Sequence, residues 1–333
     1  MKQYTLAIIG ATGAVGREMI HILQTRNFPV GELVPLASNR SAGKTVVFRG
    51  KEIAVAEASP AAFAGVDLVL GAAENRIAQA LAPAIVKAGA VFVDNSSAFR
   101  LDPRVPLVVP EVNPEDVAGH QGILSNPNCT TIITLTAVQA LDRLSPILRM
   151  VASTYQATSG AGAEGPAELR QQMQALLQGQ PLTPRVFPHP IACNVIPCIG
   201  ALQEQGYTAE EMKLHYESRK ILHRPELQAS CTCVRVPVER SHSVSIRLTF
   251  GRPVSVAEAR AAIAAAPGCK LVDDLENQQY PMPLEAAGQD LVYVGRIRPD
   301  LADPCSLHLW CSGDQLRKGA ATNAVQIAEL LIG

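Results

Sequence analysis

The chain has 333 residues, with 29 Lys plus Arg against 30 Asp plus Glu and a formal net charge of −1. This length favours two domains, each able to bury its own core, over the alternative of one long closed domain. The balanced charge argues against a broad basic surface, so we expect neither nucleic acid nor a membrane among the partners. An anionic ligand must then be bound by a local group of donors.

The cysteine content and the N-terminal sequence indicate in which cellular compartment we expect the protein. The run "MKQYTLAIIG" reaches a glycine too soon for a signal peptide, and no later apolar run has membrane-spanning length. The eight cysteines lack the spacing of a disulfide framework. We therefore expect reduced thiols in a cytoplasmic protein.

Short apolar runs alternate with helical patterns over the first third of the chain. The predicted strands are residues 4–10, 32–38, 67–73 and 90–96, and the predicted helices are residues 15–25 and about 77–88. Strands that alternate with helices are typical of a parallel sheet with helices on both faces. The sequence therefore predicts an α/β fold that opens with a Rossmann-like, doubly wound parallel sheet.

The strand pattern changes after residue 150. The predicted strands there are longer and partly alternating, at residues 151–157, 231–238, 243–250, 291–297 and 306–311. The predicted helices are residues 163–177, 209–222 and 256–265, and the final segment, 316–333, is also helical. This succession suits an α+β domain whose mainly antiparallel or mixed sheet has one face against helices.

A glycine-rich turn, "GATGAVG", lies between the first predicted strand and the first predicted helix. Such a turn presents backbone N–H groups and the positive end of the helix to a phosphate. Its spacing departs from the commoner G-x-G-x-x-G, but its position at the start of a βαβ series supports a dinucleotide site. The expected contacts are Gly10, Thr12, Gly13, Ala14, Val15 and Gly16.

The end of the second predicted strand indicates which dinucleotide binds. An NAD site usually has an acidic side chain there for the ribose hydroxyls, whereas this chain has "ASNRSAGK". Arg40 can pair with a 2′-phosphate, and Ser38 and Ser41 can donate hydrogen bonds to it. We therefore expect NADP(H); a solvated basic loop is the alternative.

One cysteine stands in the polar stretch "SNPNCTTI", residues 125–132. Apolar residues with helical spacing follow it, and either Asn126 or Asn128 can cap that helix. Both choices place Cys129 in the first turn, where the helix dipole stabilises a thiolate. A small packed cysteine is the alternative. The polar residues on both sides favour a nucleophile.

A nucleophilic cysteine needs a proton carrier, for which histidine is suited. His308 alternates within a strand beside Trp310, which indicates packing, and His189 lies ambiguously between two prolines. His242, in "RVPVERSHS", begins a strand after a turn, where a side chain can project from a sheet edge. The spacing favours His242.

Ten segments together resemble those of bacterial aspartate-β-semialdehyde dehydrogenases, in the same order and over essentially the whole chain. They are "GATGAVG", "SNRSAGK", "VDNSSAFR", "VVPEVN", "SNPNCTT", "YQATSGAG", "ESRKIL", "CVRVPVERSHS", "VGRIR" and "LRKGAATNAVQIAELL". The resemblance implies an NADP-binding Rossmann-like domain of residues 1–128 plus 316–333. It further implies a catalytic and dimerisation domain of residues 129–315, and a homodimer.

The resemblance also implies a reaction. Cys129 would attack β-aspartyl phosphate and expel phosphate, and NADPH would reduce the resulting thioester to aspartate β-semialdehyde, reversibly, with His242 as acid and base. This step serves the biosynthesis of lysine, threonine, methionine, isoleucine and diaminopimelate. The alternatives are N-acetyl-γ-glutamyl-phosphate reductase, a more distant malonyl-CoA reductase, and a catalytically silent paralogue. The forms "ESRK" and "NPNCTT" favour aspartate semialdehyde.

The remaining roles implied by the resemblance fall on residues that would touch a ligand. Those for the substrate are Arg235 for the α-carboxylate, Glu217 for the ammonium, Lys220 and Arg100 for phosphate, and Gln156 to orient the intermediate. Those for the nicotinamide are Ser159, Gly160, Gly162 and Asn323. The alternatives without a ligand are that Glu217 and Lys220 form a solvated ion pair, and that Arg100 and Arg235 are surface arginines with buried stems.

The other cysteines indicate no metal site. Paired C-x-x-C motifs and histidine clusters at ligand spacing are both missing from the sequence. Cys193 stands where the resemblance leads us to expect an aromatic residue, a change of local packing rather than of catalysis.

Overall fold

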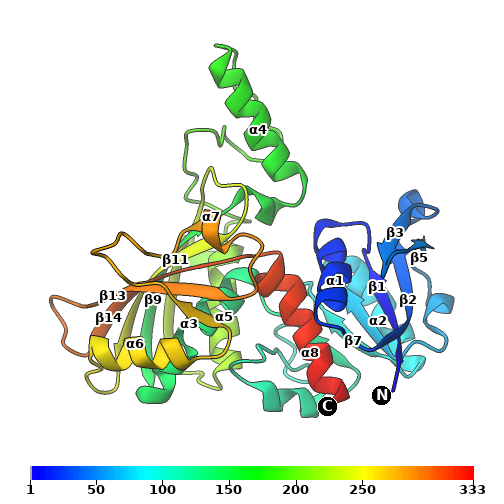
Figure 1. The fold of residues 1–333 in the computed structure, drawn as a ribbon, viewed down its shortest axis with the longest axis horizontal. Helices are drawn as coiled ribbons and strands as arrows, with labels where there is room; N and C mark the ends of the chain where they lie inside the picture. The colour runs from blue at the N-terminus through cyan, green and yellow to red at the C-terminus, as the bar shows by residue number, and fades with distance from the viewer. Residues whose placement is uncertain (1) are drawn as a thin grey trace. The chain divides into compact units, whose positions relative to one another are not determined.

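A computed structural model describes residues 2–333, which divide into two compact units. The first unit comprises residues 2–128 and Ala320–Gly333, and the second comprises Cys129–Gly319 (Figure 1). The chain thus returns to the first unit only for its last helix. Among residues 2–333, no helix combines the length and apolar character needed to cross a membrane.

The first unit is built on a six-stranded sheet in which every neighbouring pair is parallel. In spatial order its strands are β5 (Ala56–Glu57), β2 (Val30–Ala37), β1 (Tyr4–Ile9), β6 (Leu68–Gly71), β7 (Val91–Asp94) and β8 (Ile123–Ser125). Its helices are α1 (Ala14–Thr25), α2 (Asn75–Lys87) and α8 (Thr322–Ile332). The predicted Rossmann-like parallel sheet is confirmed.

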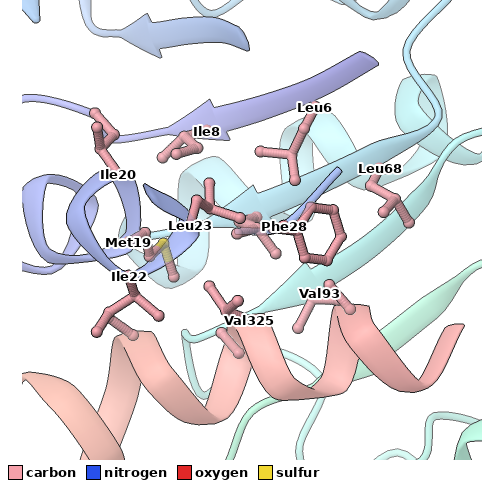
Figure 2. Packing of buried hydrophobic residues seen from close by; sticks show 14 of the residues in the cluster. Leu6, Ile8, Met19, Ile20, Ile22, Leu23, Phe28, Leu68, Val93 and Val325 are labelled. Atoms are coloured by element: carbon pink, nitrogen blue, oxygen red, sulfur yellow. The ribbon is translucent and has the colours of Figure 1, made fainter. Parts of the chain in front are cut away.

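The side chains of β1 show why helices cover both faces of this sheet. Leu6 and Ile8 point into one apolar cluster with residues of α1 and α8, whereas Ala7 and Ile9 point into another with residues of α2. Figure 2 shows Leu6 and Ile8 in the same cluster as Met19 of α1 and Val325 of α8. Because alternate residues of a strand face opposite sides, a strand buried on both faces is apolar throughout.

Four short strands of the first unit escaped prediction, one of them β8 at the far edge of the sheet. β3 (Thr45–Phe48) and β4 (Lys51–Ala54) form an antiparallel hairpin directly after the loop "SNRSAGK". β5 joins the sheet beside β2. Because the sheet is parallel, β1, β2, β5 and β6 all end at one edge. Ligands of open α/β sheets bind at this edge.

The second unit has a mixed six-stranded sheet. In spatial order its strands are β10 (Gln228–Arg235), β9 (Ile147–Gln156), β11 (His242–Phe250), β14 (Ser306–Gly313), β13 (Val292–Pro299) and β12 (Cys269–Leu271). β10 pairs with β9 and β12 with β13 in parallel, and the other neighbours are antiparallel. The predicted mixed sheet is confirmed.

Helices pack on one face of this sheet. They include α3 (Cys129–Leu144), which contacts four of the strands, α5 (Ala209–Ile221) beside β10, and α6 (Val256–Ala265) beside β12 and β13. α7 (Pro283–Ala286) is a single turn, and α4 (Glu164–Leu177) stands away from the sheet (Figure 1). The opposite face keeps half-exposed side chains, among them Val151, Tyr155 and Trp310, with the last two rings 5.1 Å apart.

Candidate active site

A pocket of about 680 Å³ opens where the strands of the first unit end. Its lining brings together five of the residues predicted for the cofactor: Gly10, Thr12, Gly13, Ser38 and Arg40. Gly10 has a φ of +78°, and a Cβ there would lie 2.3 Å from the carbonyl oxygen of Ala72. The tight turn that follows β1 therefore requires a residue without a side chain at this position.

Four further predicted cofactor residues lie next to residues of this lining in the first unit. Ala14, Val15 and Gly16 form the first turn of α1, so its N-terminus adjoins the glycine turn. Ser41 lines an adjacent groove of about 600 Å³ together with Lys44, whose Nζ lies 3.5 Å from the Ser41 hydroxyl.

The cofactor pocket also contains an acid that sequence reasoning missed. Glu57 reaches the pocket from β5, a two-residue strand with no recognisable pattern of its own. It stands on the neighbouring strand rather than at the end of β2, where an NAD-binding acid was sought. Both a carboxylate and the Arg40 guanidinium therefore line this pocket.

Arg100 is almost completely buried in the first unit, at 7% exposure. Its Nε donates to the carbonyl oxygen of Asn126 at 3.0 Å and its Nη2 donates to that of Asn95 at 2.6 Å. The guanidinium is thus oriented by backbone carbonyl oxygens, and its positive charge acts on the nearby carboxyl group of Asp94.

Asn323, predicted beside the nicotinamide, is fully buried in the first unit. Its amide donates to the Asn126 side-chain oxygen at 2.7 Å and to the carbonyl oxygen of Val108 at 3.0 Å. Asn126 in turn donates to the Asn95 side chain at 2.5 Å. The hydrogen bonds between these three asparagine side chains fix the residues directly before Cys129. The contact of Asn323 with a nicotinamide stays a prediction.

In the second unit, Cys129 is the first residue of α3 and is partly exposed. It therefore lies in the helical turn where unpaired N–H groups and the dipole favour an anion. Gly319 packs against it, because a Cβ at Gly319 would lie 3.0 Å from the Cβ of Cys129. The prediction that Cys129 lies in the first turn of a helix is confirmed.

Three further predicted residues come together at the ends of neighbouring strands. Gln156 ends β9, Arg235 ends β10 and His242 begins β11. β9 lies between the other two strands, with Arg235 opposite Gln156 and Ser243 opposite Tyr155. The sheet register alone thus brings these three residues to one edge of the second unit.

His242 is fully buried, and its two ring nitrogens have different surroundings. The N–H of Ala157 donates to Nδ1 at 3.0 Å, and Nε2 has no hydrogen-bond partner among the described residues. Because a backbone N–H can only donate, the proton of the neutral ring lies on Nε2. Burial, reinforced by the nearby charge of Arg235, lowers the pKa of His242 to about 3. The free protein therefore holds a neutral imidazole whose N–H is available to a bound molecule.

Arg235 is also buried, at 6% exposure. Its Nη1 donates to the carbonyl oxygen of Ala157 at 2.6 Å. Burial lowers the pKa of Arg235, and the charges of Glu210 and Cys129 act in the opposite direction. A thiolate at Cys129 is therefore close enough to Arg235 for the two charges to interact.

The glycine loop predicted beside the nicotinamide lies against these two side chains. A Cβ at Gly160 would lie 2.7 Å from Nη1 of Arg235 and 3.2 Å from Cε1 of His242. Ser159 is buried and accepts a hydrogen bond from Gln315, and Gly162 has a φ of +86°. Only a residue without a side chain lets this loop approach both groups.

The structure brings Glu210 and Lys213 of α5 to this cluster. Nε2 of Gln156 lies 3.5 Å from Oε1 of Glu210, and Nζ of Lys213 donates to the other oxygen at 2.8 Å. Glu217 is buried two turns further along α5, roughly 10 Å away at 1.5 Å per residue. The roles that the resemblance gives to Glu217 and Lys220 stay predictions, but the geometry favours the earlier pair.

Gln315 is a buried site residue that sequence reasoning missed. Its Oε1 accepts from the N–H of Ser241 at 2.8 Å, and its Nε2 donates to the hydroxyl of Ser159. Ser241 precedes His242 and has a left-handed φ of +75°. Gln315 thus connects the glycine loop to the turn that presents the histidine. Its partners are 156 and 74 residues away in sequence, so no local pattern identifies it.

Among residues 2–333, no three side chains of His, Cys, Asp or Glu gather as a metal site would require. Cys231 and Cys233, which share one face of β10, have sulfur atoms 3.6 Å apart. Cys193, found where an aromatic residue was expected, is exposed in a loop with a φ of +56°.

Two family models match the chain. Residues 5–120 match the NAD binding domain of semialdehyde dehydrogenases, and residues 139–318 match their dimerisation domain. The fold and the site therefore define a semialdehyde dehydrogenase with a nucleotide-binding first domain.

Comparison with similar proteins shows which semialdehyde dehydrogenase family the chain belongs to. The chain is 51% identical to an aspartate-semialdehyde dehydrogenase of Synechocystis sp., covering 98% of this chain and 97% of that protein. It is 46% identical to the enzyme of the same name in Bacillus subtilis, covering 98% and 96%. Aspartate semialdehyde dehydrogenase II of Vibrio cholerae, solved in complex with ASA, is 41% identical with a TM-score of 0.96, covering 100% and 99%. The chain belongs to the aspartate-semialdehyde dehydrogenase family, which confirms the family inferred from its motifs.

Proposed function

We propose that this chain catalyses the reversible, NADPH-dependent conversion of β-aspartyl phosphate to aspartate β-semialdehyde and phosphate through a thioester on Cys129. This step would supply the biosynthesis of lysine, threonine, methionine, isoleucine and diaminopimelate. The observation that carries the proposal is the grouping of Cys129, at the start of a helix, with buried Arg235 and His242 in one unit.

Cys129 is the nucleophile in this proposal. Its thiolate attacks the acyl carbon and the C–O bond to phosphate breaks, so that phosphate leaves with the electron pair of that bond. The first turn of α3 and the charge of Arg235 both favour the anionic sulfur. A bound nicotinamide cofactor supplies the hydride that reduces the thioester carbonyl carbon.

His242 stabilises the negative charge that develops on the carbonyl oxygen. Its Nε2–H donates to that oxygen as negative charge develops on hydride addition. When the hemithioacetal oxyanion collapses, the C=O bond re-forms, the C–S bond breaks and the thiolate departs, while the ring proton stays on Nε2. The Ala157 N–H supports this role because it keeps the ring proton on Nε2.

The substrate's other charged groups need partners of opposite sign. Arg235 suits the α-carboxylate, because a guanidinium can bind two carboxylate oxygens at once. We assign the ammonium to Glu210 and the phosphate to Lys213 and Arg100, with Glu217 and Lys220 as the sequence-based alternative. Gln156, which contacts Glu210, would orient the acyl intermediate.

NADP(H) is the proposed cofactor. The lining of the first-unit pocket by Arg40 and Ser38 supports a 2′-phosphate site, and an aspartate semialdehyde dehydrogenase of Candida albicans has been solved with NADP. Replacing Arg40 by Ala should weaken binding of NADPH far more than that of NADH. Equal losses for both would contradict the 2′-phosphate role.

We also propose a cytoplasmic homodimer. The match to a dimerisation domain supports the dimer, and the half-exposed aromatic face at Tyr155 and Trp310 is suited to an interface. All eight cysteines are thiols, which suits a reducing compartment.

The test is a paired assay. The purified protein should reduce NADP in the presence of phosphate and aspartate β-semialdehyde, and should fail with N-acetylglutamate semialdehyde. The Cys129→Ala variant should lose turnover, and mass spectrometry of the enzyme trapped with aldehyde and NADP without phosphate should find an acyl adduct on Cys129. A preference for the N-acetylated aldehyde would favour the glutamyl-phosphate reductase reaction, and no turnover of either would favour a silent paralogue.

A further inference from the structure

A proline-rich segment after α4 is held by a buried carboxylate. Glu168 of α4 is only 5% exposed. Its Oε2 accepts from the backbone N–H groups of Arg185, at 3.0 Å, and Val186, and its Oε1 accepts from the Gln172 amide at 2.8 Å. Because a buried carboxylate is costly without such donors, the segment and Glu168 stabilise each other.

Gln172, one turn further along α4, holds the other end of the same segment. Its Oε1 accepts from the backbone N–H groups of Ile191 at 2.8 Å and Ala192 at 3.1 Å. Residues four apart lie on one helix face, so α4 fixes residues 185–192 at both ends.

Phe187 lies between these two anchors and is 8% exposed. It packs with Leu169, Ile191 and Ile196 in a small apolar cluster of its own. The tip of its ring meets Gly165, where a Cβ would lie 3.3 Å from the ring carbon Cζ. The face of the ring lies 5.8 Å from the guanidinium carbon of Arg235, within the range of a cation–π interaction.

We propose that Phe187, held by Glu168 and Gln172, is a positioning residue for Arg235. The ring fixes the guanidinium plane without consuming any of its N–H donors, whereas a carboxylate partner would consume donors and cancel the charge. The carbonyl oxygen of Ala157 holds one nitrogen of the same group, at 2.6 Å. This inference rests on the proposed binding of the substrate α-carboxylate by Arg235.

Substitution of the ring tests the proposal. Phe187→Leu should raise KM for aspartate β-semialdehyde by roughly 5- to 30-fold, the range that a partly to fully desolvated cation–π contact spans. The kcat and the KM values for NADP and phosphate should stay within about twofold, since the contact acts before and not during the chemical steps. Comparable changes in all four constants would mean a general structural role and would overturn the proposal.

Fluorinated phenylalanines separate electrostatics from shape. Each added fluorine weakens the negative face of the ring with little change in size, so KM should rise stepwise with fluorine number at position 187. The matched control is the same series at Phe250, buried in β11, where KM should not change with fluorine number. A KM independent of fluorination at position 187 would overturn the positioning role.

The hydrogen bonds from residues 185–192 to Glu168 and Gln172 can be tested without measuring enzyme turnover. Glu168→Gln should speed amide hydrogen exchange at residues 185–187, because a neutral amide accepts more weakly than a carboxylate. Unchanged exchange would refute the anchoring. Lack of turnover by the unsubstituted protein would instead refute the proposed function, so the two failures are distinguishable.

Discussion

Replacing Glu210 by Gln removes the charge proposed to meet the substrate ammonium and keeps the shape of the side chain. A charge-assisted hydrogen bond contributes about 1.5–3 kcal/mol, so kcat/KM for aspartate β-semialdehyde should fall roughly 10- to 150-fold. The existing pair with Lys213 is partly exposed, with side-chain exposures of 33% for Lys213 and 11% for Glu210. Its loss should therefore lower the free energy of unfolding by less than about 1 kcal/mol.

Glu217→Gln is the matched control, on the same face of the same helix. Glu217 is 2% exposed, so its replacement should lower the thermal stability. It should change kcat/KM by less than about threefold, because it lies roughly 10 Å further along α5. The assay is the initial rate of NADP reduction with saturating phosphate and varied aldehyde, with thermal melts of each variant. A large loss of kcat/KM in Glu217→Gln, with normal kinetics in Glu210→Gln, would refute our assignment.

Three further predictions concern the turn around the histidine. Between pH 6.5 and about 3, His242 binds a proton in the unfolded chain but stays neutral in the folded protein. As pH falls through this range, the free energy of unfolding should therefore fall by up to about 1.4 kcal/mol per pH unit. His242→Gln should lack this part of the slope, and parallel pH profiles of stability would contradict it. Gly160→Ala should lower kcat/KM at least about tenfold with a small change in melting temperature, because its Cβ would displace Arg235 and His242. Gln315→Leu should reduce kcat more than it weakens NADPH binding, as measured by cofactor titration; the reverse order would assign Gln315 to the cofactor alone.

Local patterns predicted most of the first unit. The alternation of apolar runs with helical spacing, and the glycine turn after β1, are properties of short windows, and the structure keeps them at nearly the predicted bounds. The start of a helix at Cys129 was equally local. β5 was not predictable, because a strand of two residues exists only through its pairing with β2.

The candidate substrate residues on α5 show what a sequence cannot decide. Glu210 with Lys213 and Glu217 with Lys220 have the same spacing, and seven residues are nearly two turns, so both pairs face the same side. Only the tertiary contact with Gln156 distinguishes them. Gln315 was missed for a related reason, since both of its partners are distant in sequence.

The pairing of β10 and β11 with the strand between them, β9, bears on the length of substrate that the proposed site would accept. Residues 236–241 are all that separates Arg235 from His242, and the strands on either side are held in register by β9. The distance between the group that would bind one end of a substrate and the group that would act on the other is thus set by the pairing of both strands with β9. Attempts to redirect this scaffold to shorter or longer aldehydes should begin with the side chains at the ends of β10 and β11, because the pairing with β9 keeps the distance between these ends fixed.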